Sequence, residues 1–124
     1  MCIRDSSPTV YGDGTQAYDF VHFDDCARAN VLAMKADSSA RLYNVCTGKQ
    51  TSIKELACYL IDLSGHDVEI DYQPEEASHV TDRIGDPLLA KQDLGFVART
   101  DLVDGLRGLI SWRNEHREMG NIVR

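Results

Sequence analysis

Clustered positive charge is missing from this sequence. Its 124 residues carry 13 Lys and Arg against 20 Asp and Glu, a net charge of −7, and the basic residues form no run. A nucleic-acid surface needs clustered Lys and Arg to neutralise phosphates, so the composition argues against nucleic acid as a partner. A single pocket arginine that faces an anionic ligand is still compatible with an acidic chain.

Long apolar runs and paired cysteines are missing as well. No window approaches the roughly 18 apolar residues that a membrane span requires, and residues 1–7 lack the apolar core of a signal peptide. The four cysteines lie far apart, with no Cys-x-x-Cys pair and no histidine at ligand spacing. Three of them lie in apolar runs, where a free cysteine behaves as a small hydrophobic residue. We therefore expect no metal site, no disulfide and no membrane partner, and a reducing cytoplasm as the location.

The sequence also lacks the common catalytic motifs. It has no GxxxxGK[ST] phosphate loop and no GxxGxxG, and none of its five tyrosines is followed four residues later by lysine. The four histidines lie in separate segments, without a nucleophile-elbow serine or cysteine beside them. The Gly12-Asp13-Gly14 stretch has two glycines and precedes a strand, so by itself it predicts a turn. Taken alone, the residues indicate an α/β piece with no assigned activity.

Periodicity and capping residues predict the secondary structure. A short extended piece at residues 10–11 precedes the Gly-Asp-Gly turn, and the helical spacing of Ala27, Val31, Leu32 and Met34 predicts the apolar face of the first helix. A strand at 19–23 precedes this helix, which is capped by Asp24 or Asp25 and ends near residue 36. A strand at 41–46 follows that is apolar enough to be buried on both faces, and then a helix that runs from the capping box of Ser52 and Glu55 to residue 63 and is ended by Gly65. The last elements are a strand at 68–72, a helix between Asp86-Pro87 and Gly95, and a helix capped by Thr100 that ends near residue 116. Three clear strands are few for a doubly wound sheet, and the strand at 41–46 lacks neighbours in this chain.

Five ordered blocks resemble the extended short-chain dehydrogenase/reductases, the family of NAD-dependent nucleotide-sugar epimerases and dehydratases. They are GDG-x-Q at 12–16, DFVHFDDCARA at 19–29, LYNVCTG at 42–48, SIKEL at 52–56 and DPLLAKQDLGF at 86–96, followed by a closing GLRGLISWR at 105–113. The resemblance implies an α/β fold, the C-terminal substrate-binding part of such an enzyme, at 8–118. One strand–helix unit, at 19–46, would complete a Rossmann sheet that this chain does not contain. Residues 1–7 are expected to be a non-native or disordered start, and 119–124 a tail.

The resemblance also implies a function. The chain would be the part that binds the nucleoside-diphosphate sugar in an NAD-dependent epimerase or dehydratase, most simply a UDP-sugar 4-epimerase. The parent would be a homodimer that passes a hydride to NAD and back. Because the family's Tyr-x-x-x-Lys pair and glycine-rich NAD motif are missing, this chain alone is expected to bind no NAD and to be inactive. A non-catalytic binding or scaffolding module derived from the same fold remains the alternative.

The loop at 9–18 is implied to lie over the nucleoside diphosphate, with Tyr11 beside the base and the glycines allowing close approach. The implied substrate-binding residues are Thr9, Tyr11, Gly14, Gln16, Tyr18 and Arg83.

Two departures from the family pattern concern the phosphate-binding arginines. Tyr18 stands where the family has one arginine, and the Glu-Ala-Ser-His segment at 76–79 stands where it has the second. A buried diphosphate needs compensating charge, and the planar guanidinium of Arg83 could supply it with two parallel hydrogen bonds. The alternative for Arg83 is a surface ion pair with Asp82 or Asp86.

Overall fold

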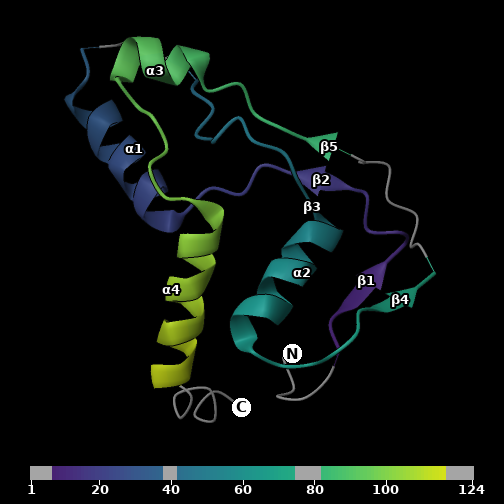
Figure 1. Ribbon diagram of the computed structural model, residues 1–124. Helices are drawn as coiled ribbons and strands as arrows, with labels where there is room; N and C mark the ends of the chain where they lie inside the picture. Colours follow the sequence, from purple (N-terminus) through teal and green to yellow (C-terminus); the bar gives the residue numbers. More distant parts are fainter. Residues whose placement is uncertain (1–6, 38–41, 75–81, 117–124) are drawn as a thin grey trace, which may run out of the picture.

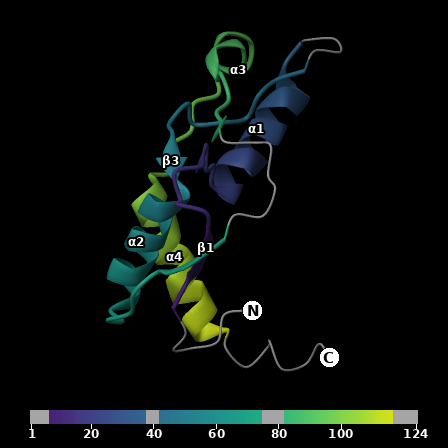
Figure 2. The ribbon, with the colours of Figure 1, turned by 90° about the vertical axis from the view of Figure 1, so that its right-hand side faces the viewer.

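The computed structural model describes residues 7–37, 42–74 and 82–116. Within them it contains, in chain order, β1 (Thr9–Tyr11), β2 (Ala17–Tyr18), α1 (Phe23–Lys35), β3 (Thr51–Ser52), α2 (Ile53–Ser64), β4 (Asp71–Gln73), β5 (Asp82–Arg83), α3 (Leu88–Leu94) and α4 (Leu102–Glu115). The molecule is elongated: α1 and α3 lie together at one end, and α2, α4 and the two-stranded sheet lie toward the other (Figure 1). The view from the side shows the same separation (Figure 2). The predicted start and tail lie outside the described residues, except for Ser7.

Two small sheets connect the helices. Strand β1 pairs with β4 in parallel, and the second sheet has the order β3-β2-β5, with β2 antiparallel to β3 and parallel to β5. Since β3 runs directly into α2, this second sheet joins the start of α2 to the chain segment that leads into α3. The mixed α/β architecture agrees with the fold class expected from the sequence.

The apolar core lies between α1 and α3. Ala29, Ala90, Leu94 and Phe96 are buried there, and Phe96 is fully enclosed. Partly buried apolar residues surround this cluster: Leu32, Ala36, Tyr43, Val45 and Ala98. Burial of this kind is the main favourable contribution to folding, so this cluster holds α1 and α3 together.

The outer side of α1 is apolar but exposed. Of the four residues predicted to form its apolar face, only Leu32 packs against the core, whereas Val31 is 47% exposed and Met34 86% exposed. Phe23, at the first turn, is 68% exposed. The core of this chain instead takes up Ala29 of α1, which packs against Ala90 and Leu94 of α3.

A buried carboxylate ties α1 to the segment before α4. Asp25 is 2% exposed and accepts hydrogen bonds from the backbone N–H groups of Arg99 and Thr100 and from the guanidinium of Arg28. The Arg28 guanidinium also lies 5.0 Å from the centre of the Phe96 ring, a cation–π contact. Burial alone raises the pKa of Asp25, but the hydrogen bonds from Thr100, Arg28 and Arg99 outweigh it and lower the pKa to about 2.

Most predicted helix ends are confirmed. The capping box of Ser52 and Glu55 forms in both directions, and Gly65 and Gly95 end α2 and α3 with left-handed φ values of 69° and 65°. Asp86 accepts a hydrogen bond from the N–H of Leu88 at the start of α3. These signals work because each cap depends on residues within one turn of the helix end.

Two predicted N-caps are wrong. Helix α1 begins after His22, whose Nδ1 accepts a hydrogen bond from the N–H of Asp24, and α4 begins after Asp101, whose side chain accepts from the N–H of Val103. The predicted caps were Asp24 or Asp25 for α1 and Thr100 for α4. Asp25 does not cap α1 because its carboxylate is directed at the backbone of Thr100.

The two predicted central strands do not form within the described residues. Residues 19–22 and 42–46 belong to no strand, and Leu42, expected to be buried, is 95% exposed. A strand requires a hydrogen-bonding neighbour along its length, and within the described residues the only bond of the first segment to a neighbouring strand is from the N–H of Asp19 to the carbonyl of Arg83. The strand predicted at 68–72 is shifted to Asp71–Gln73, where β1 provides its partner.

Candidate functional site

A row of three side chains crosses the three-stranded sheet. Tyr18 is paired with Thr51 on one side and with Arg83 on the other. Residues that are paired across neighbouring strands share a face of the sheet, so these three side chains lie on one face. The ring of Tyr18 meets that of Phe20 edge-on at 6.2 Å, and Arg83 is exposed. The fold thus brings together two residues of the predicted substrate site that are distant in sequence.

The guanidinium of Arg83 is not neutralised by the neighbouring carboxylates. Within the described residues, no ion pair joins Arg83 to Asp82 or Asp86. Asp82 instead accepts a hydrogen bond of 2.8 Å from Nε2 of Gln50, and Asp86 accepts one of 2.9 Å from the N–H of Leu88. The surface ion pair that the sequence left open is therefore absent from this part of the chain, and Arg83 is available to an anion.

Asp19 fixes the turn behind this row. Its carboxylate accepts hydrogen bonds from the N–H and hydroxyl of Thr47, at 2.9 and 2.6 Å, and from the N–H of Gly48, at 2.7 Å. Its own N–H donates to the carbonyl of Arg83 at 2.9 Å. Sequence reasoning gave Asp19 no role, because its partners lie 28 or more residues away; its place in the DFVHFDDCARA block was the only signal.

The Gly-Asp-Gly turn packs against the start of α2. The carbonyls of Gly14 and Gln16 accept hydrogen bonds from Lys54 and Ile53, two N–H groups in the first turn of that helix. A Cβ on Gly14 would lie 3.0 Å from Cβ of Lys54, and the φ of Gly14 is +76°. Close approach of the backbone to α2 and a left-handed conformation therefore both require glycine here.

The other predicted residues of this loop lie on or beside β1. Thr9 and Tyr11 are exposed, Tyr11 by 50%, while Val10 between them is buried. The Gln16 side chain donates to the carbonyl of Tyr11 at 3.0 Å and closes the loop. The structure thus joins Tyr11, Gly14 and Gln16 in one loop and Tyr18 with Arg83 in one sheet. The segment at 76–79, where the resemblance places a second arginine, lies outside the described residues.

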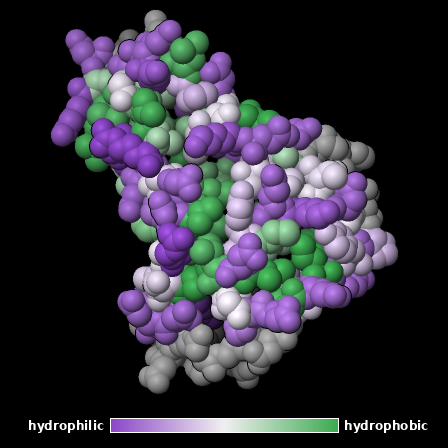
Figure 3. All heavy atoms as spheres, in the orientation of Figure 1, coloured by the Kyte–Doolittle hydropathy of each residue, from purple (hydrophilic) through white to green (hydrophobic). Residues whose placement is uncertain are grey.

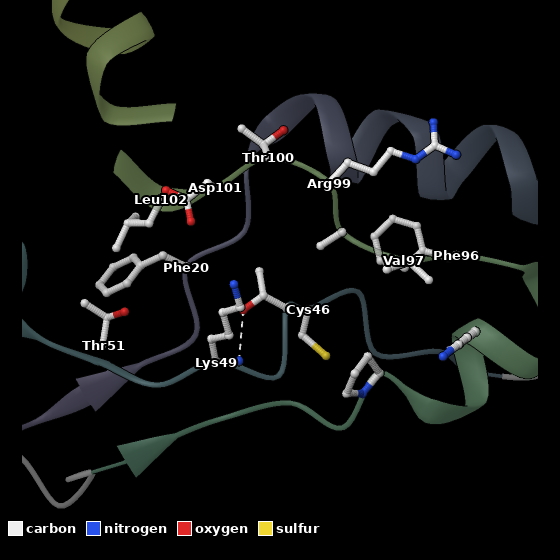
Figure 4. Close-up of a pocket in the computed structure, with 14 residues that line it drawn as sticks. Phe20, Cys46, Lys49, Thr51, Phe96, Val97, Arg99, Thr100, Asp101 and Leu102 are labelled. Atoms are coloured by element: carbon white, nitrogen blue, oxygen red, sulfur yellow. Dashed lines mark hydrogen bonds between the residues drawn. The ribbon is translucent and has the colours of Figure 1, made fainter. Parts of the chain in front are cut away.

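Two hollows adjoin this sheet. An open one of about 550 Å³ lies beside Arg83, lined also by Asp19, Asn44 and Asp82 together with residues 43, 45–46 and 84–85. The other, of about 310 Å³, lies between Phe20 and the loop that precedes α4 (Figure 4). Lys49 points into this second hollow, whereas Arg99 points away from it along α1. Of the two, only the hollow beside Arg83 adjoins the predicted phosphate-binding residue.

The thiol of Cys46 is a packing group. Burial raises its pKa, so it stays protonated near neutral pH and is a poor nucleophile. A Cβ on Gly85 would lie 2.6 Å from Sγ of Cys46, which means that the segment before α3 passes directly over this thiol. The expectation of a small hydrophobic role is met here, whereas Cys58 is exposed.

Two of the histidines have structural partners. His22 caps α1, and His116 stacks on Trp112 at the end of α4, with ring centres 4.7 Å apart. These residues contain no group of three His, Cys, Asp or Glu side chains that could hold a metal ion. None of their helices is long and apolar enough to cross a bilayer.

Comparison with known proteins places this geometry in a family. The sequence profile of the NAD dependent epimerase/dehydratase family matches residues 2–46. A dTDP-glucose 4,6-dehydratase of Streptomyces griseus is 30% identical over 109 residues, which are 87% of this chain and 33% of that protein.

Two solved structures extend the likeness to the fold. The UDP-glucose 4-epimerase of Thermotoga maritima, with UDP-glucose, matches with a TM-score of 0.87 and 31% identity over 93% of this chain and 37% of that one. The UDP-glucuronic acid 4-epimerase of Bacillus cereus, in complex with UDP-glucuronic acid and NAD, matches with a TM-score of 0.82 and 26% identity over 90% and 36% of the two chains. This chain therefore spans about a third of the length of these relatives. It belongs to the NAD-dependent epimerase/dehydratase family and has the fold of the C-terminal part of its extended short-chain dehydrogenase/reductase members.

Proposed function

We propose that this chain is the nucleotide-sugar-binding part of an NAD-dependent epimerase or dehydratase, most simply a UDP-sugar 4-epimerase. The observation that carries the proposal is the pairing of Tyr18 with Arg83 on one face of the sheet. Tyr18 occupies the position of a phosphate-binding arginine in the family, and the register places the guanidinium of Arg83 in the adjacent strand. In this proposal, the guanidinium of Arg83 replaces the arginine that is missing at position 18.

The charge arrangement supports a diphosphate as the ligand of Arg83. A planar guanidinium can donate two parallel hydrogen bonds to phosphate oxygens, and such charge-assisted bonds are stronger than neutral ones. The carboxylates of Asp82 and Asp86 are held by other donors, so they do not compete for it.

In the proposed site, Tyr11 lies beside the base, and the loop that contains Thr9, Gly14 and Gln16 covers the ligand. The glycine in this loop is already required by packing on α2, so its contribution to binding is to hold Tyr11 and Gln16 in place. NAD and the acid–base residues would belong to the other two-thirds of the enzyme. The chain itself contributes recognition of the substrate.

Titration of UDP-glucose into the ¹⁵N-labelled chain, followed by NMR, tests this function. We expect weak binding, with shifts at Tyr18 and at the Nε–H of Arg83. Arg83→Ala should weaken it at least about tenfold, because a hydrogen bond to a charged group typically contributes about 1.5–3 kcal/mol. Arg113→Ala, an exposed arginine on the last turn of α4, is the matched control. If both variants bound UDP-glucose with equal affinity, the proposed nucleotide-sugar binding would be wrong. It would also be wrong if the addition of UDP-glucose changed no resonance.

A further inference from the structure

Acidic residues surround Arg83 in the sequence, yet the sheet separates them from it. Successive side chains of a strand point to opposite faces, so Asp82 lies on the face opposite to Arg83, and Asp19 on the face opposite to Tyr18. The register confirms the separation: Asp82 is paired with Ala17, and Arg83 with Tyr18. One face of the sheet thus carries the carboxylates, and the other carries Tyr18 and Arg83.

Each of these carboxylates has a donor on its own side of the sheet. Asp19 is held by the turn at Thr47 and Gly48, and Asp82 by the side-chain amide of Gln50 at 2.8 Å. Gln50 directly precedes β3, two residues before Ser52. Because side chains alternate along a strand, Gln50 shares the face of Ser52 and not that of Thr51. This places the Gln50 amide on the carboxylate face, across 32 residues of chain from Asp82.

This arrangement is sensitive to the loss of one hydrogen bond. Strand β5 has only two residues and lies at the edge of its sheet, and both its side chains are exposed. A carboxylate released at such an edge can turn toward the guanidinium of the next residue. Exposed ion pairs of this kind are weak, but they would neutralise the cation that the proposed function requires.

We propose that Gln50 is a positioning residue: by holding Asp82 on the opposite face of the sheet, it keeps Arg83 free for a phosphate group. The inference rests on the proposed function for its purpose, but the charge separation itself is measurable without a ligand. Gln50 does not touch the substrate in this scheme. It acts only through Asp82.

The first experiment uses NMR of the free chain. In Gln50→Ala, the Nε–H resonance of Arg83 should move, because Asp82 now reaches the guanidinium. In Gln50→Ala with Asp82→Asn, it should return toward its position in the Asp82→Asn variant. Gln73→Ala is the matched control, since Gln73 holds Asp71 on β4 in the same way, at 2.9 and 3.0 Å. An Arg83 resonance that does not respond to Gln50→Ala overturns the proposal.

The second experiment measures affinity for UDP-glucose in the wild type, Gln50→Ala, Asp82→Asn and the double variant. Gln50→Ala should weaken binding about two- to fivefold, the range that an exposed ion pair supports. The same change should have no effect when residue 82 is already Asn, and the loss should shrink at high salt, which screens exposed charges. An equal loss in both backgrounds would show that Gln50 acts through the fold and would overturn the proposal. If Arg83→Ala leaves the affinity unchanged, the proposed function fails, and the resonance comparison still decides the role of Gln50.

Discussion

The carboxylate of Asp25 accepts a hydrogen bond of 2.9 Å from the backbone N–H of Thr100, which is 75 residues away in the chain. This contact fixes the direction in which the chain enters α4, because Thr100 lies just ahead of the Asp101 cap. It also anchors α1, whose Asp25 is one of only two buried residues of that helix. A short polar contact therefore holds together the two ends of the elongated molecule.

We expect Asp25→Asn to destabilise the fold by about 2–3 kcal/mol, because it removes the charge from a buried network of hydrogen bonds. Urea denaturation followed by circular dichroism measures the change. Asp104→Asn is the matched control, since Asp104 forms an exposed pair with Arg107 and should contribute less than about 1 kcal/mol. Similar losses in the two variants would contradict the role given to Asp25.

The same residue predicts a pH dependence. Its pKa in the folded state, about 2, lies below the ordinary value of 3.8. The carboxylate therefore stabilises the fold fully above about pH 4, and this contribution, about 2 kcal/mol, is lost as the pH falls toward 2. Thermal melts between pH 2 and 6 should show a steeper acid decline in the wild type than in Asp25→Asn. Parallel declines would mean that another group is responsible.

Gly85→Ala should destabilise the chain by about 1–3 kcal/mol, because its Cβ would overlap Sγ and Cβ of Cys46 at 2.6 and 2.7 Å. Gly108→Ala provides the opposite case: apart from its chain neighbours and the backbone of its own helix turns, nothing lies within 4 Å of its Cβ position in α4. There, alanine should stabilise the helix by about 0.5–1 kcal/mol. Thermal melts of the two variants should therefore shift in opposite directions, and a shared direction would refute the packing argument.

Arg83→Lys tests whether the planar guanidinium group or only its positive charge is needed for binding. Lysine keeps the charge but cannot donate two parallel hydrogen bonds from one plane. We expect it to recover only part of the UDP-glucose affinity that Arg83→Ala loses, as measured by the same titration. Full recovery would show that charge alone attracts the ligand, and that the planar geometry has no part in it.

The exposed apolar side of α1 predicts association. Phe23, Val31 and Met34 are exposed there (68%, 47% and 86%), and apolar side chains also gather between α2 and α4 (Figure 3). A hollow of about 450 Å³ lies at that second place, lined by leucines of the two helices together with residues 20–23, 100–101 and 105. Contiguous apolar surface of this kind binds hydrophobic dyes and promotes self-association. Val31→Glu with Met34→Lys should reduce both, measured by dye fluorescence and sedimentation; a monodisperse wild type that binds no dye would contradict the prediction.

The isolated chain should not bind NAD, because the glycine-rich motif and the Tyr-x-x-x-Lys pair of the family are missing from its sequence. Calorimetry with NAD should give no heat of binding in the micromolar range. Binding of that strength would mean that the described residues hold a cofactor site that the family pattern does not anticipate.

Some features of this protein are determined by short stretches of sequence. The capping box at Ser52 and Glu55, the glycine stops at Gly65 and Gly95 and the turn at Gly14 were all predictable. Each depends on backbone groups within a few residues, or on a φ value that only glycine adopts without strain. The ordered motif blocks determined the family in the same way, because their residue types and spacing are themselves the signal.

Other features were decided only in three dimensions. The apolar segment at 42–46 has strand composition but forms no strand, because pairing requires a neighbouring backbone that composition does not supply. Asp25 was a plausible helix cap until the backbone of Thr100 was brought beside it. The proposed site depends on such contacts as well: sequence could suggest Arg83, but only the register of β2 with β5 placed it beside Tyr18. Contacts between residues distant in sequence depend on how the whole chain packs, and no local pattern records them.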